Sequence, residues 1–326
     1  MCGRYASARK RQELLEEFRV ERDLVAESLP PDYNVAPTKP VYAVLTRRES
    51  GSRQPETAQP RKAQPRKAQP KKAQPEKAQP ETAEPVTAGA PESGAGEPPE
   101  TPVRELRVVR WGLVPFWAKD VKIGSRLINA RAETVSTKPA FRRAFARRRC
   151  LLPADGFYEW QAPGDGPVRD GPRGRKQPYF IHRGDGGVLA FAGLYELWRD
   201  PDAPDSDPAA WLWTAAIITT EAPDDLGRIH DRTPMVIEPG RWADWLDPGQ
   251  TDEATLRGLL APAVSGALSS YPVSTEVNAV SHNGPGLIEP LDPYPDPEPA
   301  GTPAASRRAT AGERGDASHG AAGKLF

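Results

Sequence analysis

The stretch Cys150-Leu-Leu-Pro-Ala-Asp-Gly-Phe-Tyr-Glu-Trp160 indicates the fold more clearly than any other part of the chain. An apolar run, Cys150–Ala154, is followed by the turn residues Asp155-Gly156 and then by Phe157–Trp160, where apolar and polar side chains alternate. Apolar runs separated by Asp-Gly are typical of paired strands. We therefore expect Cys150–Ala154 and Phe157–Trp160 to be partner strands.

Other short segments on both sides of this pair also have the apolar character of strands. The expected strands are residues 41–46, 105–111, 178–182, 188–194, 212–220, 271–273 and 276–280. The expected helices are residues 7–18 with Ser7 as cap, 139–148, 224–229, 239–246 and 251–260, and the expected loops are 33–38 and 163–174. Many short strands without regular βαβ alternation predict an α+β fold with an antiparallel, barrel-like β core and short flanking helices.

Two segments of biased composition interrupt this pattern. Residues 50–103 carry the pentad Ala-Gln-Pro-x-Lys in tandem, and residues 292–326 are rich in Pro, Ala, Gly and Ser. Frequent proline and few large apolar side chains exclude a packed core, so we expect both segments to be disordered. The rest predicts one domain, residues 1–291, in which the repeat lengthens a loop between two neighbouring strands at small entropic cost.

Positive charge is concentrated in one part of the chain, although the formal net charge is zero. Residues 104–149 contain 13 Lys or Arg but only three Asp or Glu, an excess of ten. The helix expected at 139–148 places Phe141 and Phe145 among arginines that include Arg142 and Arg143. This pattern favours a polyanionic partner, with an ordinary solvated surface as the alternative.

Cys2 and Cys150 are the only cysteines in 326 residues. A disulfide framework is therefore excluded, and a reducing cytoplasm is the expected compartment. The polar residues after Cys2 do not resemble a signal peptide, and no apolar run is long enough to cross a membrane. The histidines lack the spacing of metal ligands, so no metal is expected; they are His182, His230, His282 and His319.

The N-terminal Met1-Cys2-Gly3-Arg4 offers distinctive chemistry. Removal of Met1, which is usual before a small residue, leaves Cys2 with a thiol and an α-amine on adjacent carbons. That amine titrates near ~7.7–8, so about a tenth of it is free base at neutral pH, far more than for a lysine. The two groups together can capture an aldehyde, first as an imine and then as a five-membered thiazolidine. A cysteine at position 2 also occurs by chance, so this residue alone does not decide the function.

Further motifs follow in order along the expected domain. They are MCGR (1–4), YNVAP (33–37), WGL (111–113), NARAE (129–133), GFYEW (156–160) and HDRTPM (230–235). In this order they resemble the SRAP (SOS response-associated peptidase) family of abasic-site sensors, and the resemblance spans nearly the whole domain. The repeat segment and the tail depart from the family, and neither contains a motif.

The resemblance implies a barrel-like fold and covalent capture of abasic sites in single-stranded DNA. An abasic deoxyribose equilibrates between a closed hemiacetal and an open aldehyde, which Cys2 would trap as a thiazolidine. The adduct would shield the lesion during the DNA damage response. No cofactor is implied, the protein is expected to be a monomer, and the peptidase of the family name would at most cover removal of Met1.

Three motif residues have expected roles in this chemistry. His230, which titrates near neutrality, would protonate the ring oxygen of the sugar. Glu159, placed among aromatic side chains that raise its pKa, would shuttle protons. Asn129 would orient the sugar or Cys2 by hydrogen bonding. His230 and Asn129 also fit purely structural roles, as a hydrogen-bonded histidine and a turn asparagine.

The remaining expected site residues would bind DNA. They are Arg4, Asn34, Phe116, Trp117, Arg131, Arg142 and Arg143. Arg4 and Arg131 would contact phosphates next to the lesion. Phe116 and Trp117 would stack on bases, with packing in the core as the alternative.

Two other functions remain open at this point. An N-terminal-nucleophile hydrolase also begins with Met-Cys-Gly and uses its amine as base for the thiol, but we recognise neither its oxyanion motif nor its glutamine pocket. A non-covalent single-strand binder would need only the basic residues.

Overall fold

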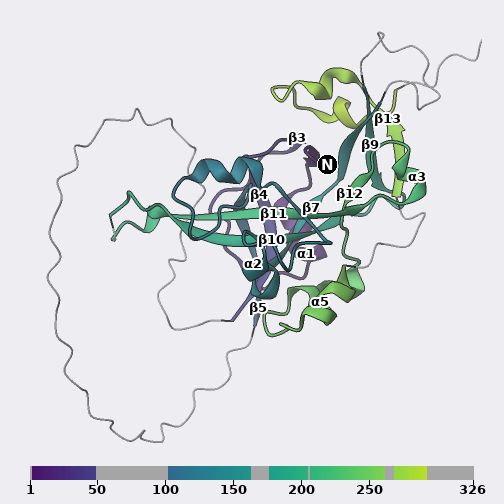
Figure 1. Ribbon diagram of the computed structural model, residues 1–326. Coiled ribbons are helices and arrows are strands. Elements are labelled where there is room, and N and C mark those ends of the chain that lie inside the picture. The colour runs from purple at the N-terminus through teal and green to yellow at the C-terminus, as the bar shows by residue number, and fades with distance from the viewer. Residues whose placement is uncertain (1, 49–101, 163–175, 205, 261–267, 292–326) are drawn as a thin grey trace, which may run out of the picture. The chain divides into compact units, whose positions relative to one another are not determined.

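The computed structural model describes residues 2–48, 102–162, 176–204, 206–260 and 268–291 (Figure 1). The repeat segment apart from its last two residues, the tail and the loop expected at 163–174 lie outside these ranges. The domain boundaries inferred from composition therefore stay a prediction.

Five strands close into a barrel. They are β4 (Pro40–Arg47), β5 (Val103–Trp111), β7 (Arg149–Ala154), β10 (Leu189–Arg199) and β11 (Trp211–Glu221). Neighbours in the order β11-β10-β7-β4-β5 are antiparallel, and a parallel pairing of β5 with β11 closes the ring. The predicted α+β, barrel-like fold is confirmed, with one parallel pair in an otherwise antiparallel ring.

Two paired strands, β4 and β5, flank the segment between residues 48 and 102. Arg47 at the end of β4 lies opposite Val103 at the start of β5. The chain therefore leaves and re-enters the barrel at opposite positions of one strand pair, as expected for a loop between two neighbouring strands.

A second sheet contains the N-terminal strand. It consists of β1 (Tyr5–Ser7), β3 (Asp32–Val35), β8 (Gly156–Gln161), β9 (Gln177–Arg183) and β13 (Leu268–Pro272). The order is β13-β9-β8-β1-β3, with every pairing antiparallel. β1 therefore lies between β3 and β8, although β8 is some 150 residues away in sequence.

The strand pair expected within residues 150–160 is wrong in one respect, because the two strands are not partners. β7 pairs with β4 and β10 in the barrel, whereas β8 pairs with β1 and β9 in the second sheet. The chain changes sheets at Asp155, whose carboxylate accepts a 2.6 Å hydrogen bond from the backbone N–H of Ala8. Gly156 permits the crossing, since a Cβ there would lie 2.6 Å from the carbonyl oxygen of Ile181.

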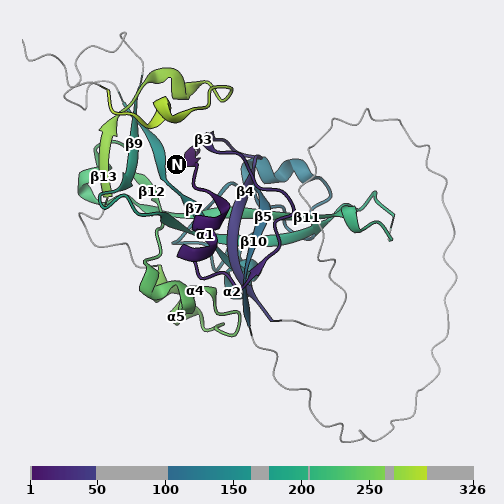
Figure 2. The ribbon, with the colours of Figure 1, turned by 180° about the vertical axis from the view of Figure 1, so that it is seen from behind.

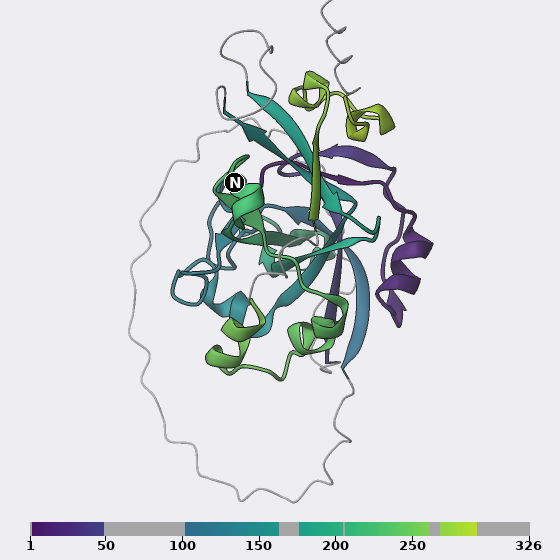
Figure 3. The ribbon, with the colours of Figure 1, turned by 90° about the vertical axis from the view of Figure 1, so that its right-hand side faces the viewer.

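Short elements complete the fold. The remaining strands are β2 (Arg22–Asp23), β6 (Asn129–Arg131) and β12 (Arg232–Pro234); the helices are α1 (Arg11–Glu17), α2 (Arg142–Arg147), α3 (Asp224–Gly227), α4 (Trp242–Leu246) and α5 (Glu253–Leu259); the 3₁₀ turns are η1 (Val121–Arg126), η2 (Pro208–Ala210), η3 (Pro239–Arg241), η4 (Thr275–Asn278) and η5 (Pro285–Ile288). β6 and β12 both attach to β11. The second sheet and the segment after β13 lie on one side of the barrel, and α4 and α5 lie on another (Figures 2 and 3).

Three local expectations differ from the structure. The first helix spans only Arg11–Glu17, because Ser7 belongs to β1 and Lys10 precedes the helix without a side-chain cap. The loop expected at 33–38 overlaps β3, which pairs with β1. Residues 276–280 contain η4 rather than a strand. The first two differences have one cause, since strands of three and four residues show no periodicity of their own and exist only through their partners.

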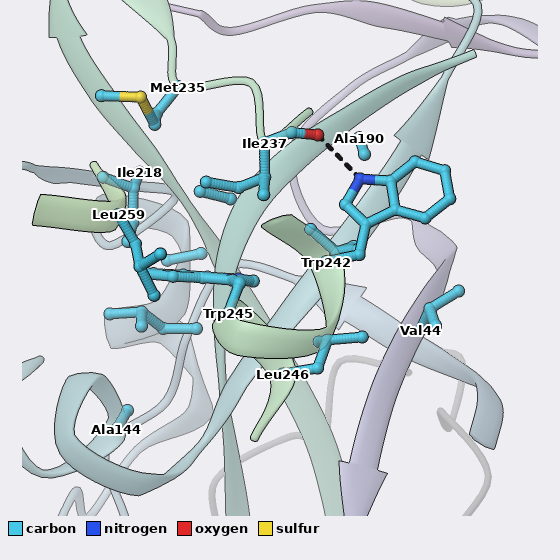
Figure 4. Close-up of a cluster of buried hydrophobic side chains, with 14 of the residues drawn as sticks. Val44, Ala144, Ala190, Ile218, Met235, Ile237, Trp242, Trp245, Leu246 and Leu259 are labelled. Atoms are coloured by element: carbon cyan, nitrogen blue, oxygen red, sulfur yellow. Dashed lines mark hydrogen bonds between the residues drawn. The ribbon is translucent and has the colours of Figure 1, made fainter. Parts of the chain in front are cut away.

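An outer apolar cluster attaches the helices to the barrel. It joins strand residues such as Val44 and Ile218 to Trp242 and Trp245 of α4 (Figure 4). The indole N–H of Trp242 donates a 2.7 Å hydrogen bond to the Ile237 carbonyl oxygen, so this large side chain is buried with its polar atom satisfied (Figure 4).

An inner apolar cluster fills the barrel. Its members on the barrel strands include Val41, Ala43, Leu45, Val109, Trp111, Cys150, Leu152, Phe191, Trp213, Ala215 and Ile217. The same cluster continues into Cys2 and Tyr5. The N-terminal residues are therefore packed against the barrel core.

Gly193 on β10 provides a test of this packing. It lies opposite Cys150 of β7, and a Cβ at position 193 would be 2.8 Å from the Cys150 Sγ. We expect Gly193→Ala to lower the free energy of unfolding by about 1–3 kcal/mol in urea titrations, because the overpacked core must shift. In Gly193→Ala/Cys150→Ala the sulfur is gone, so the loss should be smaller than the sum of the two single losses. Additive losses would contradict the close contact.

Candidate active site

Cys2 is fixed at the end of the barrel by strand β1. The backbone N–H of Tyr158 in β8 donates a 3.0 Å hydrogen bond to the Arg4 carbonyl oxygen. The ring of Tyr5 packs edge-on against Trp111 and Phe191 of the barrel, with centroid distances of 5.2 and 5.8 Å. The chain just before β1 is thereby held against both sheets.

The Cys2 thiol is fully buried, with 0% of the residue exposed. Its Sγ lies 4.0 Å from the Arg4 carbonyl oxygen, to which it donates a weak hydrogen bond. Burial raises the pKa of this thiol, and the nearby Glu159 carboxylate raises it further. Cys2 is therefore a neutral thiol at pH 7, and its use as a nucleophile requires a group that takes up its proton.

Asn129 is the first residue of β6 and pairs with Ile217 of β11. Its Nδ2 donates a 2.7 Å hydrogen bond to the Cys2 carbonyl oxygen. Its Oδ1 is buried and has no hydrogen-bond partner within the described residues. The preceding residue is anchored as well, since the Trp111 indole donates to the Ile128 carbonyl oxygen at 3.0 Å. Asn129 thus holds Cys2 and offers one unsatisfied acceptor to the site.

Glu159 extends from β8 beside Cys2 and is only 2% exposed. Burial raises the pKa of its carboxyl from 4.5 to about 7. Glu159 can therefore exchange a proton at neutral pH, a property that an exposed glutamate lacks.

His230 lies in the turn between α3 and β12 and faces Glu159. Its Nε2 is 4.0 Å from a Glu159 carboxylate oxygen. Its Nδ1 accepts a 3.0 Å hydrogen bond from the Arg232 backbone N–H, which places the proton of the neutral ring on Nε2. Asp231 Oδ1, 2.8 Å from the same Nδ1, favours the charged ring, but burial has the larger effect and the pKa of His230 is lowered. The ring is thus largely neutral at pH 7, with its N–H towards Glu159.

The structure brings four of the expected site residues to one place at the N-terminus, namely Cys2, Asn129, Glu159 and His230. No group of three or more His, Cys, Asp or Glu side chains within the described ranges has the arrangement of a metal site. A buried thiol, a carboxyl that titrates near neutrality and a neutral imidazole are suited to acid–base chemistry around a nucleophile.

Most of the expected DNA-binding side chains lie on the surface. Phe116 and Trp117 are 47% and 51% exposed, which excludes packing of these two rings in the core. Arg143 of α2 places its guanidinium 4.3 Å from the centre of the Phe116 ring. Arg131 and Arg142 are also exposed. Cations and aromatic faces are therefore available to solvent on the segments that follow β5 and on α2.

Asn34 differs from this group, because none of its surface is exposed. Its side chain is bonded to other parts of the protein, including Nη1 of Arg4 at 2.6 Å. A direct contact between Asn34 and DNA is therefore not supported by its position. The YNVAP motif carries no signal that separates a buried amide from an exposed one.

Sequence reasoning also missed an ion pair that ties two site elements together. Arg232 of β12 donates two hydrogen bonds to the Glu133 carboxylate, 2.7 and 3.0 Å long, and a third of 2.7 Å to the Thr219 carbonyl oxygen. Because Glu133 follows β6 and Arg232 follows His230, this pair couples the Asn129 and His230 segments. Glu133 lies in the NARAE motif and Arg232 in the HDRTPM motif, so their place in these motifs was the signal in the sequence that could have identified them.

The described helices include none that is both long enough and apolar enough to span a membrane.

Comparisons with known proteins identify the family. A family model described as SOS response associated peptidase (SRAP) matches residues 1–280. Abasic site processing protein YoqW of Bacillus subtilis (strain 168) is 32% identical over 289 residues, covering 89% of this chain and 99% of that protein. Abasic site processing protein HMCES of Gallus gallus is 32% identical over 213 residues, 58% of each chain. A crystal structure of a protein from Bacteroides thetaiotaomicron aligns with a TM-score of 0.50 and 28% identity, covering 57% of this chain and 77% of that one. With a family match over most of its length and a relative that it covers almost completely, this chain belongs to the SRAP family.

Proposed function

We propose that this protein captures abasic sites in single-stranded DNA by forming a thiazolidine with Cys2 after Met1 has been removed. The observation that carries the proposal is the burial of Cys2 beside Glu159, a carboxyl whose pKa is raised to about 7. The names of the related proteins, which call them abasic site processing proteins, support the same substrate.

The proposed reaction joins the open aldehyde of the abasic sugar to both nucleophiles of Cys2. The α-amine adds to C1′ and water leaves, which gives an imine. The thiol sulfur then bonds to the same carbon, and the thiol proton ends on the nitrogen. The products are one thiazolidine and one water molecule, so no oxidant, reductant or cofactor is required.

The site residues have separate roles in this reaction. His230, with its N–H on Nε2, donates a proton to the sugar ring oxygen as the hemiacetal opens. Glu159 accepts the proton of the Cys2 thiol, which burial keeps protonated, and returns it to the nitrogen. Asn129 holds the Cys2 carbonyl and can accept a hydrogen bond from the reacting amine with its unsatisfied Oδ1.

The exposed aromatic and basic side chains support a single-stranded substrate. The exposed rings of Phe116 and Trp117 can stack on unpaired bases, and the exposed Arg131, Arg142 and Arg143 can contact phosphates. Because the reacting C1′ must reach a buried thiol, a flexible strand with an unstacked lesion is easier to accommodate than a duplex.

The first experiment tests covalent capture. We expect the wild-type protein, mixed with single-stranded DNA that has one abasic site, to give a shifted band on a denaturing gel. Cys2→Ala should abolish this band, while Cys150→Ala, which changes the other cysteine, should retain it. A shift seen only on native gels would indicate passive binding, and glutamine hydrolysis without a DNA adduct would indicate an amidotransferase; either result would overturn the proposal.

The second experiment tests the amine. Residues appended before Cys2 leave the thiol in place but convert the α-amine to an amide, so the band stable to denaturation should disappear. Mass spectrometry of the wild-type protein should show that Met1 is absent. Normal crosslinking by the extended protein would rule out the thiazolidine.

The third experiment tests Glu159 through pH. The rate of crosslinking by the wild type should rise between about pH 6 and 8, because ionised Glu159 is the form that accepts the thiol proton. Glu159→Gln should slow the reaction by about 100-fold or more and remove the part of the profile near pH 7, leaving the part due to the amine. An unchanged profile in single-turnover assays would exclude Glu159 as the proton acceptor.

Thermal unfolding provides the control for this variant. Since the pKa of Glu159 is raised in the folded state, that state binds more protons than the unfolded chain between pH 4.5 and about 7. The contribution of Glu159 to stability is therefore lost as the pH rises through this range. Glu159→Gln should lack this loss and be at least as stable as the wild type at pH 8, so that its slow crosslinking cannot be attributed to unfolding.

A further inference from the structure

Asn34 is a fully buried polar side chain that connects three parts of the chain. Its amide nitrogen donates to the carbonyl oxygens of Val277, Ala279 and His282 at 3.2, 3.0 and 3.0 Å. Its amide oxygen accepts the 2.6 Å hydrogen bond from Nη1 of Arg4. A strand of the second sheet, the segment after β13 and the N-terminal residues thus meet at one amide group.

Arg4 is held at one end of its guanidinium. Besides Asn34, Nη1 contacts the Val277 carbonyl oxygen at 2.8 Å, and the guanidinium lies 5.9 Å from the centre of the Trp160 ring. On the other edge, Nε is buried and has no partner among the residues that the structure describes. Burial lowers the pKa of this guanidinium, a sign of incomplete solvation. A partly desolvated cation of this kind gains strongly from an anionic oxygen that approaches the guanidinium.

We propose that Asn34 is a positioning residue, which holds the guanidinium of Arg4 in the place where it binds a DNA phosphate next to Cys2. The inference rests on the proposed function, because the phosphate belongs to the strand that Cys2 captures. Asn34 has no exposed surface, so it acts through Arg4 and not by touching DNA. Its oxygen fixes Nη1, and its nitrogen keeps the Val277 carbonyl in place as the second acceptor for the same Nη1.

Asn283 offers a matched control. It joins the segment after β13 to the start of β3. Its amide nitrogen donates to the Pro31 carbonyl oxygen at 3.0 Å, and its oxygen accepts from the Tyr33 backbone N–H at 2.8 Å. Asn283 is exposed, and its hydrogen bonds within the described ranges do not include Arg4. Its removal weakens the join between the segments without releasing the guanidinium.

The test measures reversible binding of the full chain to undamaged single-stranded DNA over a range of salt concentrations. Arg4→Ala should weaken binding about tenfold and reduce the slope of log K against log salt by about 0.7, the value for one lost phosphate contact. Asn34→Ala should give the same two changes, and Arg4→Ala/Asn34→Ala should be no weaker than Arg4→Ala alone. Asn283→Ala should lower the melting temperature but leave the affinity and the slope unchanged.

Several outcomes would overturn the inference. These are an unchanged slope in Asn34→Ala, additive losses in the double variant, or a loss of affinity in Asn283→Ala equal to that of Asn34→Ala. Asn34→Ser, which is smaller but still polar, serves if Asn34→Ala does not fold, and failure of both to fold would make Asn34 purely structural. If the wild-type protein crosslinks abasic DNA but the losses of affinity in Arg4→Ala and Asn34→Ala are additive, only this inference is refuted. Wild-type protein that binds without crosslinking refutes only covalent capture, and no binding at all refutes both.

Discussion

The pairing of β1 with both β3 and β8 is the constraint on which the site depends. It seats Cys2 at the end of the barrel core, where Tyr5 packs against Trp111 and the Arg4 carbonyl accepts a hydrogen bond from β8. Chain termini usually fray because little holds them. Here two hydrogen-bonded neighbours and a buried aromatic ring hold the first residues, and the loss of water that results raises the pKa of both Cys2 and Glu159.

As a consequence of this burial, none of the Cys2, Glu159 and His230 side chains carries a full, fixed charge at neutral pH. The thiol is protonated, the Glu159 carboxyl titrates near neutrality, and His230 is shifted towards its neutral form. An exposed glutamate would be fully ionised at pH 7 and would have little tendency to hold a proton taken from a neighbouring group. Burial brings the proton affinities of a carboxyl and an imidazole close together, which is the condition for transfer between them at neutral pH.

β11 places the other half of the site. β6, which carries Asn129, and β12, which follows His230, both pair with this strand, and the Glu133–Arg232 ion pair joins their ends. The carboxylate of Glu133 is partly exposed, so solvent screens the pair and its value lies in geometry more than in stability.

The fold class, the five barrel strands and the chemical groups of the site could be read from the sequence alone, because apolar periodicity and motif order are local properties. Cys2, Asn129, Glu159 and His230 were predicted as one site, and the structure brings them together. Three features became apparent only in the folded structure: β7 and β8 belong to different sheets, Ser7 and Asp32–Val35 lie in strands, and Asn34 is buried while Phe116 is exposed. These features depend on residues that are distant in the sequence, since a short strand, a buried amide or a raised pKa is created by the neighbours that exclude water and not by the residues beside it in the chain.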